Sequence, residues 1–174
     1  HGKFQSHGFQ CARGTVIMGA CFDEFLKMDL SKIDVDACVA AWPTLEQEQQ
    51  RALEIFKDFP VPQLGYTEIT KKYNDAETVR QQLTKVKENW TELKERIQNQ
   101  VYTYDKMVAL MKSVGAPVGP ESIGLTRAQV RRMVDFVQLM RWRINLFDLC
   151  KRAQIYDALL DRVFGKGGVL EISK

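Results

Sequence analysis

The sequence predicts an all-α protein built as a multihelical array. The 174 residues contain no sustained alternation of polar and apolar positions and no Asn-Gly or Asp-Gly turn, so signals for strands and hairpins are absent. Apolar residues instead recur every three or four positions, as on one face of a helix. Proline and glycine divide the chain into segments of ordinary helix length. We expect about seven to nine helices.

The composition limits the class of protein. Apolar residues make up 45% and charged residues 27%, which is enough for a core and atypical of disorder. The net charge of +3 is too small an excess for a nucleic-acid-binding protein. No apolar run is long enough for a membrane span. The length suits one domain over residues 1–174.

The cysteines form no CxxC pair, which argues against a zinc ribbon and a thioredoxin-like motif. Free thiols among small and apolar residues are typical of buried positions in a cytoplasmic protein. We therefore expect a cytoplasmic chain with four buried thiols, at Cys11, Cys21, Cys38 and Cys150.

The first helix is expected over about 7–27. Small residues follow one another along it at steps of four, three and four: Gly8, Ala12, Thr15 and Gly19. This spacing places them on one face, where another backbone can approach closely. Glycine within a helix costs about 0.5–1 kcal/mol relative to alanine, so its repeated use indicates tight packing or a site that needs room.

The next two helices are predicted by their caps. Asp34 is a suitable N-cap for a short helix that Pro43 ends. Thr44 and Gln47 have capping-box spacing and begin a polar helix to about Lys57.

A loop over 59–65 and a short helix through Ile69 and Tyr73 are expected to follow. A long charged helix is then expected over 74–100. Its one-sided apolar stripe consists of Val79, Leu83, Val86, Trp90, Leu93 and Ile97.

Caps and glycines also divide the last third of the chain. The expected helices run from Thr103 to about Val114, from Thr126 through Met140, from Asn145 through Cys150 and from Tyr156 to Phe164. A loop over 115–120 separates the first two, and Gly165 stops the last. The tail over 167–170 is expected to be extended and frayed.

The two histidines of the chain, His1 and His7, both lie near its start, and no methionine precedes Met18. From this beginning we expect the C-terminal part of a larger protein. Histidine binds metals and moves protons near neutral pH, and Gly8 leaves space beside His7. A capping or surface role for His7 is the alternative. His1 does not share a helix face with His7, and the pair alone cannot complete a catalytic zinc site, which needs three protein ligands.

A basic set occupies the last third of the chain: Arg127, Arg131, Arg132, Arg141, Arg143, Lys151 and Arg152. Aspartates are interleaved with it, so ion pairs on helix surfaces are one interpretation. Recognition of a phosphate by the arginine fork is the other. The chain contains no phosphate-binding glycine loop, no HExxH and no GxSxG motif.

The run from Ser6 to Thr15, SHGFQCARGT, resembles the H-G-x-x-V-A-x-G-T stretch of the iron-containing alcohol dehydrogenase and dehydroquinate synthase-like superfamily. Within that superfamily it is most similar to the bacterial sn-glycerol-1-phosphate dehydrogenase branch. Four further segments follow in the order of that branch's C-terminal domain: Trp42-Pro43-Thr44, Gly115-Ala116-Pro117, Ile123-Gly124-Leu125 and residues 140–149. The resemblance therefore covers most of the chain.

The resemblance implies a two-domain enzyme. Its nucleotide-binding α/β domain would precede the 174 residues and bind most of an NADH or NADPH cofactor. The helical domain would supply ligands to one divalent metal (zinc, nickel or iron), held in the family by an aspartate and two histidines. His7 corresponds to one of these ligands, and the other two would lie upstream of His1, which is not assigned as a ligand. The chain departs from the pattern at Gln10, Cys11 and Arg13. These departures affect the choice of substrate more than the metal role expected of His7.

The implied reaction interconverts dihydroxyacetone phosphate and sn-glycerol 1-phosphate, with the metal polarising the carbonyl as hydride is transferred. The chemistry of the basic set suggests Arg141 or Arg143 for the substrate phosphate. Another polyol dehydrogenase, a dehydroquinate synthase and a non-catalytic helical interaction module are the alternatives. The expected partners are a phosphorylated small molecule and the chain's own N-terminal domain, without nucleic acid or a membrane. A homodimer is a further possible assembly.

Overall fold

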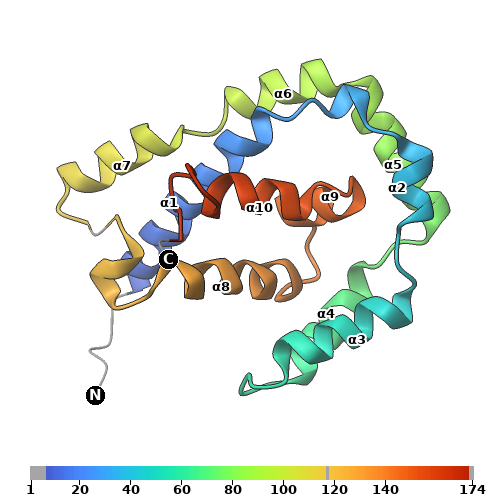
Figure 1. Cartoon of the computed structure of the whole chain (residues 1–174), viewed down its shortest axis with the longest axis horizontal. Coiled ribbons are helices and arrows are strands. Elements are labelled where there is room, and N and C mark those ends of the chain that lie inside the picture. The colour runs from blue at the N-terminus through green and yellow to red at the C-terminus, as the bar shows by residue number, and fades with distance from the viewer. Residues whose placement is uncertain (1–6, 117, 173–174) are drawn as a thin grey trace. The chain divides into compact units, whose positions relative to one another are not determined.

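The computed structural model describes residues 7–116 and 118–172, and these residues confirm the all-α class. They form ten α-helices and two short 3-10 helices and contain no strand (Figure 1). In chain order the elements are α1 (His7–Leu26), η1 (Leu30–Lys32), α2 (Val35–Ala40), α3 (Leu45–Phe56), α4 (Gln63–Lys72), α5 (Ala76–Glu88), α6 (Trp90–Gln98), α7 (Tyr104–Ser113), η2 (Pro120–Ile123), α8 (Arg127–Leu139), α9 (Leu146–Arg152) and α10 (Tyr156–Phe164). None of the described helices combines the length and the apolar character that crossing a membrane requires.

The chain divides into two compact units. The first comprises His1–Met28, Thr91–Val130 and Ala158–Lys174, and the second comprises Asp29–Trp90 and Arg131–Asp157. Helices α8 and α10 each contribute residues to both units. The expectation of one domain over residues 1–174 stays a prediction.

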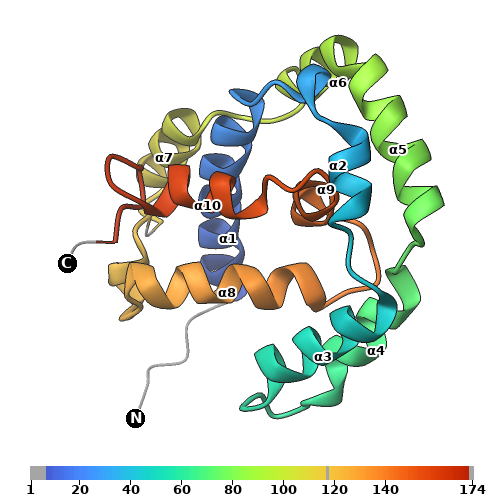
Figure 2. The ribbon, with the colours of Figure 1, turned by 45° about the vertical axis from the view of Figure 1, so that its right-hand side comes forward.

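In the first unit, α7 packs against the second half of α1 (Figure 2). A Cβ atom added to Gly19 would lie 3.6 Å from the Cα atom of Tyr104, so the small side chain does admit a neighbouring backbone. The carboxylate of Asp23 accepts a hydrogen bond from the Tyr104 backbone N–H at 2.8 Å and so caps the start of α7. At the other glycine of the predicted stripe, Gly8, no described atom lies within 4 Å of the corresponding position.

The C-terminal tail is not frayed, contrary to the prediction. Gly167 has a φ of +83°, a conformation that suits glycine, and the chain there turns back along α10. The backbone N–H of Leu170 donates to the carbonyl of Val163 at 3.0 Å, and Ile172 donates to Phe164 at 2.9 Å. Burial of the Leu170 side chain, which is 3% exposed, holds the tail in place.

The predicted helix caps are confirmed. Asp34, Thr44, Thr103 and Asn145 each accept a hydrogen bond from the first turn of the helix that follows. Thr44 and Gln47 form the complete capping box. Thr126 and Gln129 also exchange hydrogen bonds at the start of α8. Local sequence signals therefore mark the starts of five of the ten described α-helices.

Two predicted boundaries are wrong. The helix expected over 74–100 is interrupted at Asn89, whose backbone N–H and side-chain amide both donate to the carbonyl of Lys85. An asparagine that bonds its own preceding turn ends α5 there, and α6 begins with the buried Trp90. The loop expected over 59–65 is shorter, because α4 already begins at Gln63. The interruption at Asn89 raises the helix count above the expected range.

Phe56 occupies the centre of an apolar cluster in the second unit. Its ring is fully buried and makes edge contacts with Phe59 and Phe136, at centroid distances of 5.1 and 4.9 Å. Gly65 of α4 lies directly against this ring, and a Cβ atom there would be 2.7 Å from a ring carbon. The close contact between α3 and α4 therefore requires glycine at position 65.

Replacing Gly65 with alanine is expected to destabilise the chain by about 1–3 kcal/mol, because the added methyl group must displace a buried aromatic ring. Gly14→Ala is the matched control: nothing lies within 4 Å of its Cβ position in α1, so the change should stabilise by about 0.5–1 kcal/mol. Urea unfolding of both variants measures the difference. Equal effects at the two glycines would contradict the packing described for Gly65.

Candidate functional site

His7 is the first residue of α1, and its side chain is exposed. Its Nε2 atom lies 3.4 Å from the Sγ atom of Cys11, one helical turn further on. A Cβ atom added to Gly8 would meet no described atom within 4 Å, its two chain neighbours left aside. From Val16 onward α1 is anchored in the core, which makes the helix a firm support for these side chains.

Cys11 is exposed, contrary to the expectation that all four thiols are buried. The reason is its place on the helix. Cys11 precedes the buried Val16 by five residues, which at about 100° per residue places it about 140° around the axis. Cys21, Cys38 and Cys150 are buried as expected. The thiol on the outer side of α1 is thus the one beside His7.

Among the described residues, His7 and Cys11 are side chains of the types that bind metals. The described residues contain no group of three or more histidine, cysteine, aspartate or glutamate side chains that could hold a metal ion. The side chains of His7 and Cys11 are both exposed, and their donor atoms lie 3.4 Å apart. His1 lies outside the described residues. The metal role of His7 therefore stays a prediction.

Ion pairs account for three members of the basic set. Arg127 pairs with Glu121 at 2.9 Å, and Arg131 pairs with Asp135 at 3.3 Å. Arg132 lies 3.9 Å from a carboxylate oxygen of Asp58. These contacts agree with the interpretation that the arginines form ion pairs on helix surfaces.

Two further basic residues have other partners. The ammonium group of Lys151 lies 4.1 Å from the centre of the Tyr156 ring. The guanidinium group of Arg152 donates to the side-chain oxygen of Asn74 at 2.9 Å. Both bind within the fold of the second unit and are poorly placed to recognise a ligand.

Arg141 and Arg143 are different, because both are exposed in the loop between α8 and α9 and form no ion pair with any described residue. Between them, the Trp142 backbone N–H donates to Oε2 of Glu68 at 2.7 Å, which anchors the loop. Lys71, the Trp142 N–H and, more weakly, Arg141 hold the pKa of Glu68 below its ordinary value. The phosphate role of Arg141 and Arg143 stays a prediction.

Sequence reasoning missed a buried ion pair in the second unit. Nζ of Lys72 lies 2.8 Å from Oδ1 of Asp148, and the two side chains are 3% and 6% exposed. Asp148 also accepts hydrogen bonds from the Gln138 side chain at 2.7 Å and the Asn145 backbone at 2.8 Å. Lys72 donates to the backbone carbonyl of Gln138. All donors and acceptors are internal, so the pair holds α4, α8 and α9 together.

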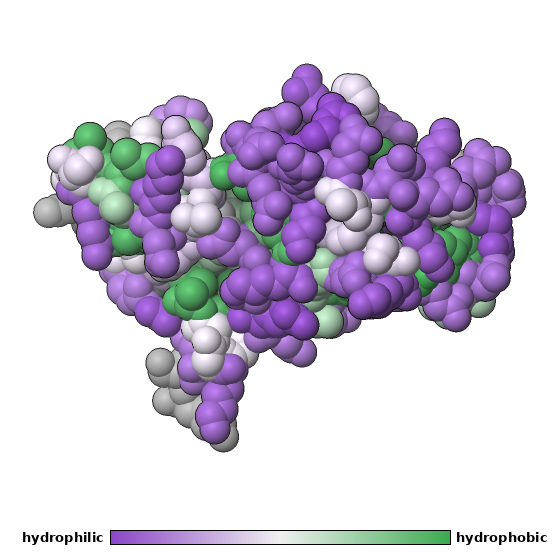
Figure 3. Space-filling view, turned by 90° about the horizontal axis from the view of Figure 1, so that it is seen from above, coloured by the Kyte–Doolittle hydropathy of each residue, from purple (hydrophilic) through white to green (hydrophobic). Residues whose placement is uncertain are grey.

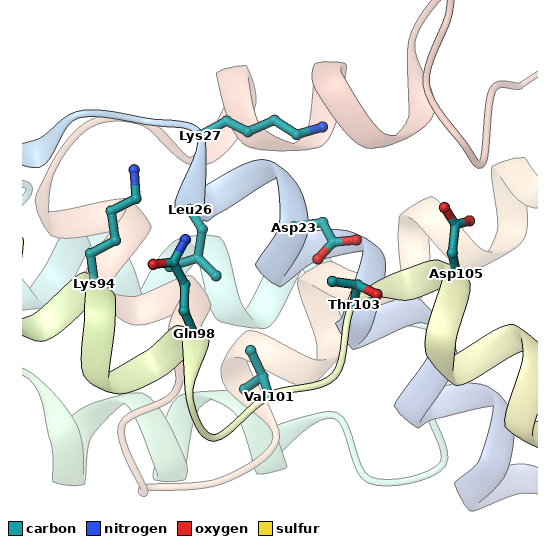
Figure 4. A pocket seen from close by; sticks show the side chains of 8 residues that line it. All are labelled: Asp23, Leu26, Lys27, Lys94, Gln98, Val101, Thr103 and Asp105. Atoms are coloured by element: carbon teal, nitrogen blue, oxygen red, sulfur yellow. The ribbon is translucent and has the colours of Figure 1, made fainter.

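A pocket of about 610 Å³ in the first unit is separate from His7. It is lined by Asp23, Leu26, Lys27, Lys94, Gln98, Val101, Thr103 and Asp105 (Figure 4). Asp23 caps α7, and Lys27 pairs with Glu24 at 2.6 Å, so two of its charged groups already have partners. Sixteen residues of helix, or about 24 Å, separate Asp23 from His7. The pocket and the imidazole cannot act on the same small ligand.

Comparison with known proteins gives no further assignment. The chain matches no protein-family model, and its comparison with curated proteins and with solved structures finds no match.

Proposed function

We propose that this chain is the metal-binding helical part of an NAD(P)-dependent dehydrogenase that interconverts dihydroxyacetone phosphate and sn-glycerol 1-phosphate. The observation that carries the proposal is the exposed imidazole of His7, held in the first turn of a helix whose later turns are buried. Its place in the Ser6-His7-Gly8 sequence is where the resembling family has a metal ligand. The metal and the remaining ligands would be shared with a nucleotide-binding domain encoded upstream.

The residues of this chain have a limited part in the chemistry. A divalent metal bound there would polarise the substrate carbonyl as a Lewis acid. His7 would donate an imidazole lone pair to hold that metal, and α1 would fix the direction of the donated pair. Gly8 would leave room for the substrate beside the imidazole. NADH or NADPH would supply the hydride from the upstream domain.

The test is an assay of carbonyl reduction by the full-length protein. With dihydroxyacetone phosphate as substrate, we expect oxidation of NADH or NADPH that stops after treatment with a chelator and returns when zinc, nickel or iron is added. The 174-residue chain alone should show no dehydrogenase activity, because the nucleotide site and two of the ligands would be missing. Undiminished activity after complete removal of metal would contradict the proposal.

Two alternatives have distinct signatures in the same assay. Activity on another polyol or its ketone, or on a dehydroquinate synthase substrate, would keep the superfamily and change the reaction. A non-catalytic interaction module is favoured by one observation, the exposure of Trp142 and Ile144, each 56% exposed. Figure 3 shows a mostly hydrophilic face with several separate hydrophobic areas. A full-length protein without hydride transfer on any of these substrates would favour the module.

A further inference from the structure

We propose that His7 and Cys11 together form a two-residue chelate for a borderline-soft divalent cation such as Zn²⁺. The pair occupies positions i and i+4 of α1, which lie on the same face of a helix. Both side chains are exposed, and their donor atoms Nε2 and Sγ face one another at 3.4 Å. Imidazole nitrogen and thiolate sulfur are the two donor types that zinc binds most often in proteins.

The separation of the two donor atoms fits a shared metal ion. Zinc lies about 2.3 Å from a thiolate sulfur and about 2.0–2.1 Å from an imidazole nitrogen. Across a tetrahedral angle of about 109° these bond lengths place sulfur and nitrogen about 3.6 Å apart. The 3.4 Å between Sγ of Cys11 and Nε2 of His7 is about 0.2 Å shorter than that value. The helix therefore presents both ligands before a metal arrives.

No described atom lies within 4 Å of a Cβ position at Gly8 or at Gly14, the glycines on either side of the pair, so the described residues leave room there for further ligands. Binding would replace the S–H bond of Cys11 with a metal–sulfur bond and release one proton to the buffer, while His7 would donate the lone pair of Nε2. Water, or ligands from another domain, would complete the shell. Soft thiolate favours zinc, cadmium and cobalt over magnesium or calcium.

The chelate shares His7 with the proposed function and adds a ligand to that same metal, which would then need five-coordination to bind the substrate carbonyl as well. It can nevertheless be measured on the 174-residue chain without any dehydrogenase activity. If Cys11 does not bind the metal but the protein is a dehydrogenase that a chelator inhibits, the chelate is wrong and the proposed function is unaffected. If His7 and Cys11 bind the metal but the protein has no dehydrogenase activity, the chelate is supported and the proposed function is wrong.

Thiol reactivity gives a direct readout of the pair. Cys11 is the exposed cysteine, whereas Cys21, Cys38 and Cys150 are buried, and burial raises the pKa of Cys21 to about 12. A chromogenic disulfide reagent should therefore react with one thiol of the native chain quickly and with the others slowly. Cys11→Ser should remove this fast reaction.

Zn²⁺ is expected to slow the fast reaction at least tenfold, because a coordinated thiolate is withdrawn from attack. His7→Ala should raise the zinc concentration needed for half-protection at least tenfold, since the thiolate then binds alone. His1→Ala is the matched control and should leave protection as in the original chain. Equal protection in the His7→Ala variant, or none in the original chain, would overturn the chelate.

Co²⁺ provides an independent optical measurement. The original chain should show a near-ultraviolet charge-transfer band from cobalt–thiolate coordination, and Cys11→Ser should abolish it. His7→Ala should raise the cobalt concentration at which the band is half-developed, just as it should raise the zinc concentration needed for half-protection. A band that persists in the Cys11→Ser variant would place the cobalt on another residue and contradict the proposal.

Discussion

Replacing His7 with alanine in the full-length protein is expected to lower turnover at least about a hundredfold without unfolding the helical domain. A metal acting as a Lewis acid contributes several kcal/mol to stabilising the transition state, and each 1.36 kcal/mol is a factor of ten in rate. His7 is exposed at the first turn of α1, and the buried residues of this helix begin further along, at Arg13 and Val16. Loss of the imidazole should therefore remove a ligand and leave the core intact.

Three measurements accompany this variant. The far-ultraviolet circular dichroism and the unfolding free energy should match the original protein within about 0.5 kcal/mol, as for other surface substitutions. The metal content after dialysis should fall. Added imidazole should restore part of the turnover by filling the vacated position. Full turnover in a folded His7→Ala protein would remove the metal role from this residue.

Most of the fold could be predicted because its signals are local. A cap such as Asp34 or Thr44 acts within four residues, so its effect on the backbone is visible in the sequence and is present in the structure. The interruption at Asn89 is also a local effect, but an apolar stripe running through it concealed the break. The return of the tail onto α10 depends on burial of Leu170, a tertiary contact that no short pattern contains.

The candidate site was only partly predictable. A motif indicated His7, but the position of Cys11 followed only once the core-facing side of α1 was known. The apolar neighbours of Cys11 in sequence suggested burial, whereas its angular distance from the core residues decides exposure. The Lys72–Asp148 pair joins residues 76 positions apart, and charged residues in a polar helix are normally expected to be solvated.

Replacing Lys72 with methionine is expected to destabilise the chain by about 3–5 kcal/mol. Removing one partner of a buried ion pair leaves the other charge uncompensated, and that penalty is larger than the net contribution of the intact pair. Burial lowers the pKa of Lys72, and the nearby Asp148 carboxylate opposes this change. The hydrogen bonds that Asp148 receives from Gln138 and Asn145 remain, which places the expected loss toward the lower end of the range.

Lys71→Met is the matched control for this measurement. Lys71 is the adjacent residue of α4, its side chain is 53% exposed, and it pairs with Glu68 at 2.7 Å. The Glu68 side chain is 11% exposed but keeps its hydrogen bond from the Trp142 N–H, so this variant should lose about 1 kcal/mol, well below the loss for Lys72→Met. The double variant Lys72→Met with Asp148→Asn should recover part of the loss, because the buried negative charge is then removed as well. Equal small losses for Lys71→Met and Lys72→Met would mean that water reaches Asp148 and that the pair does not hold α4 to α9.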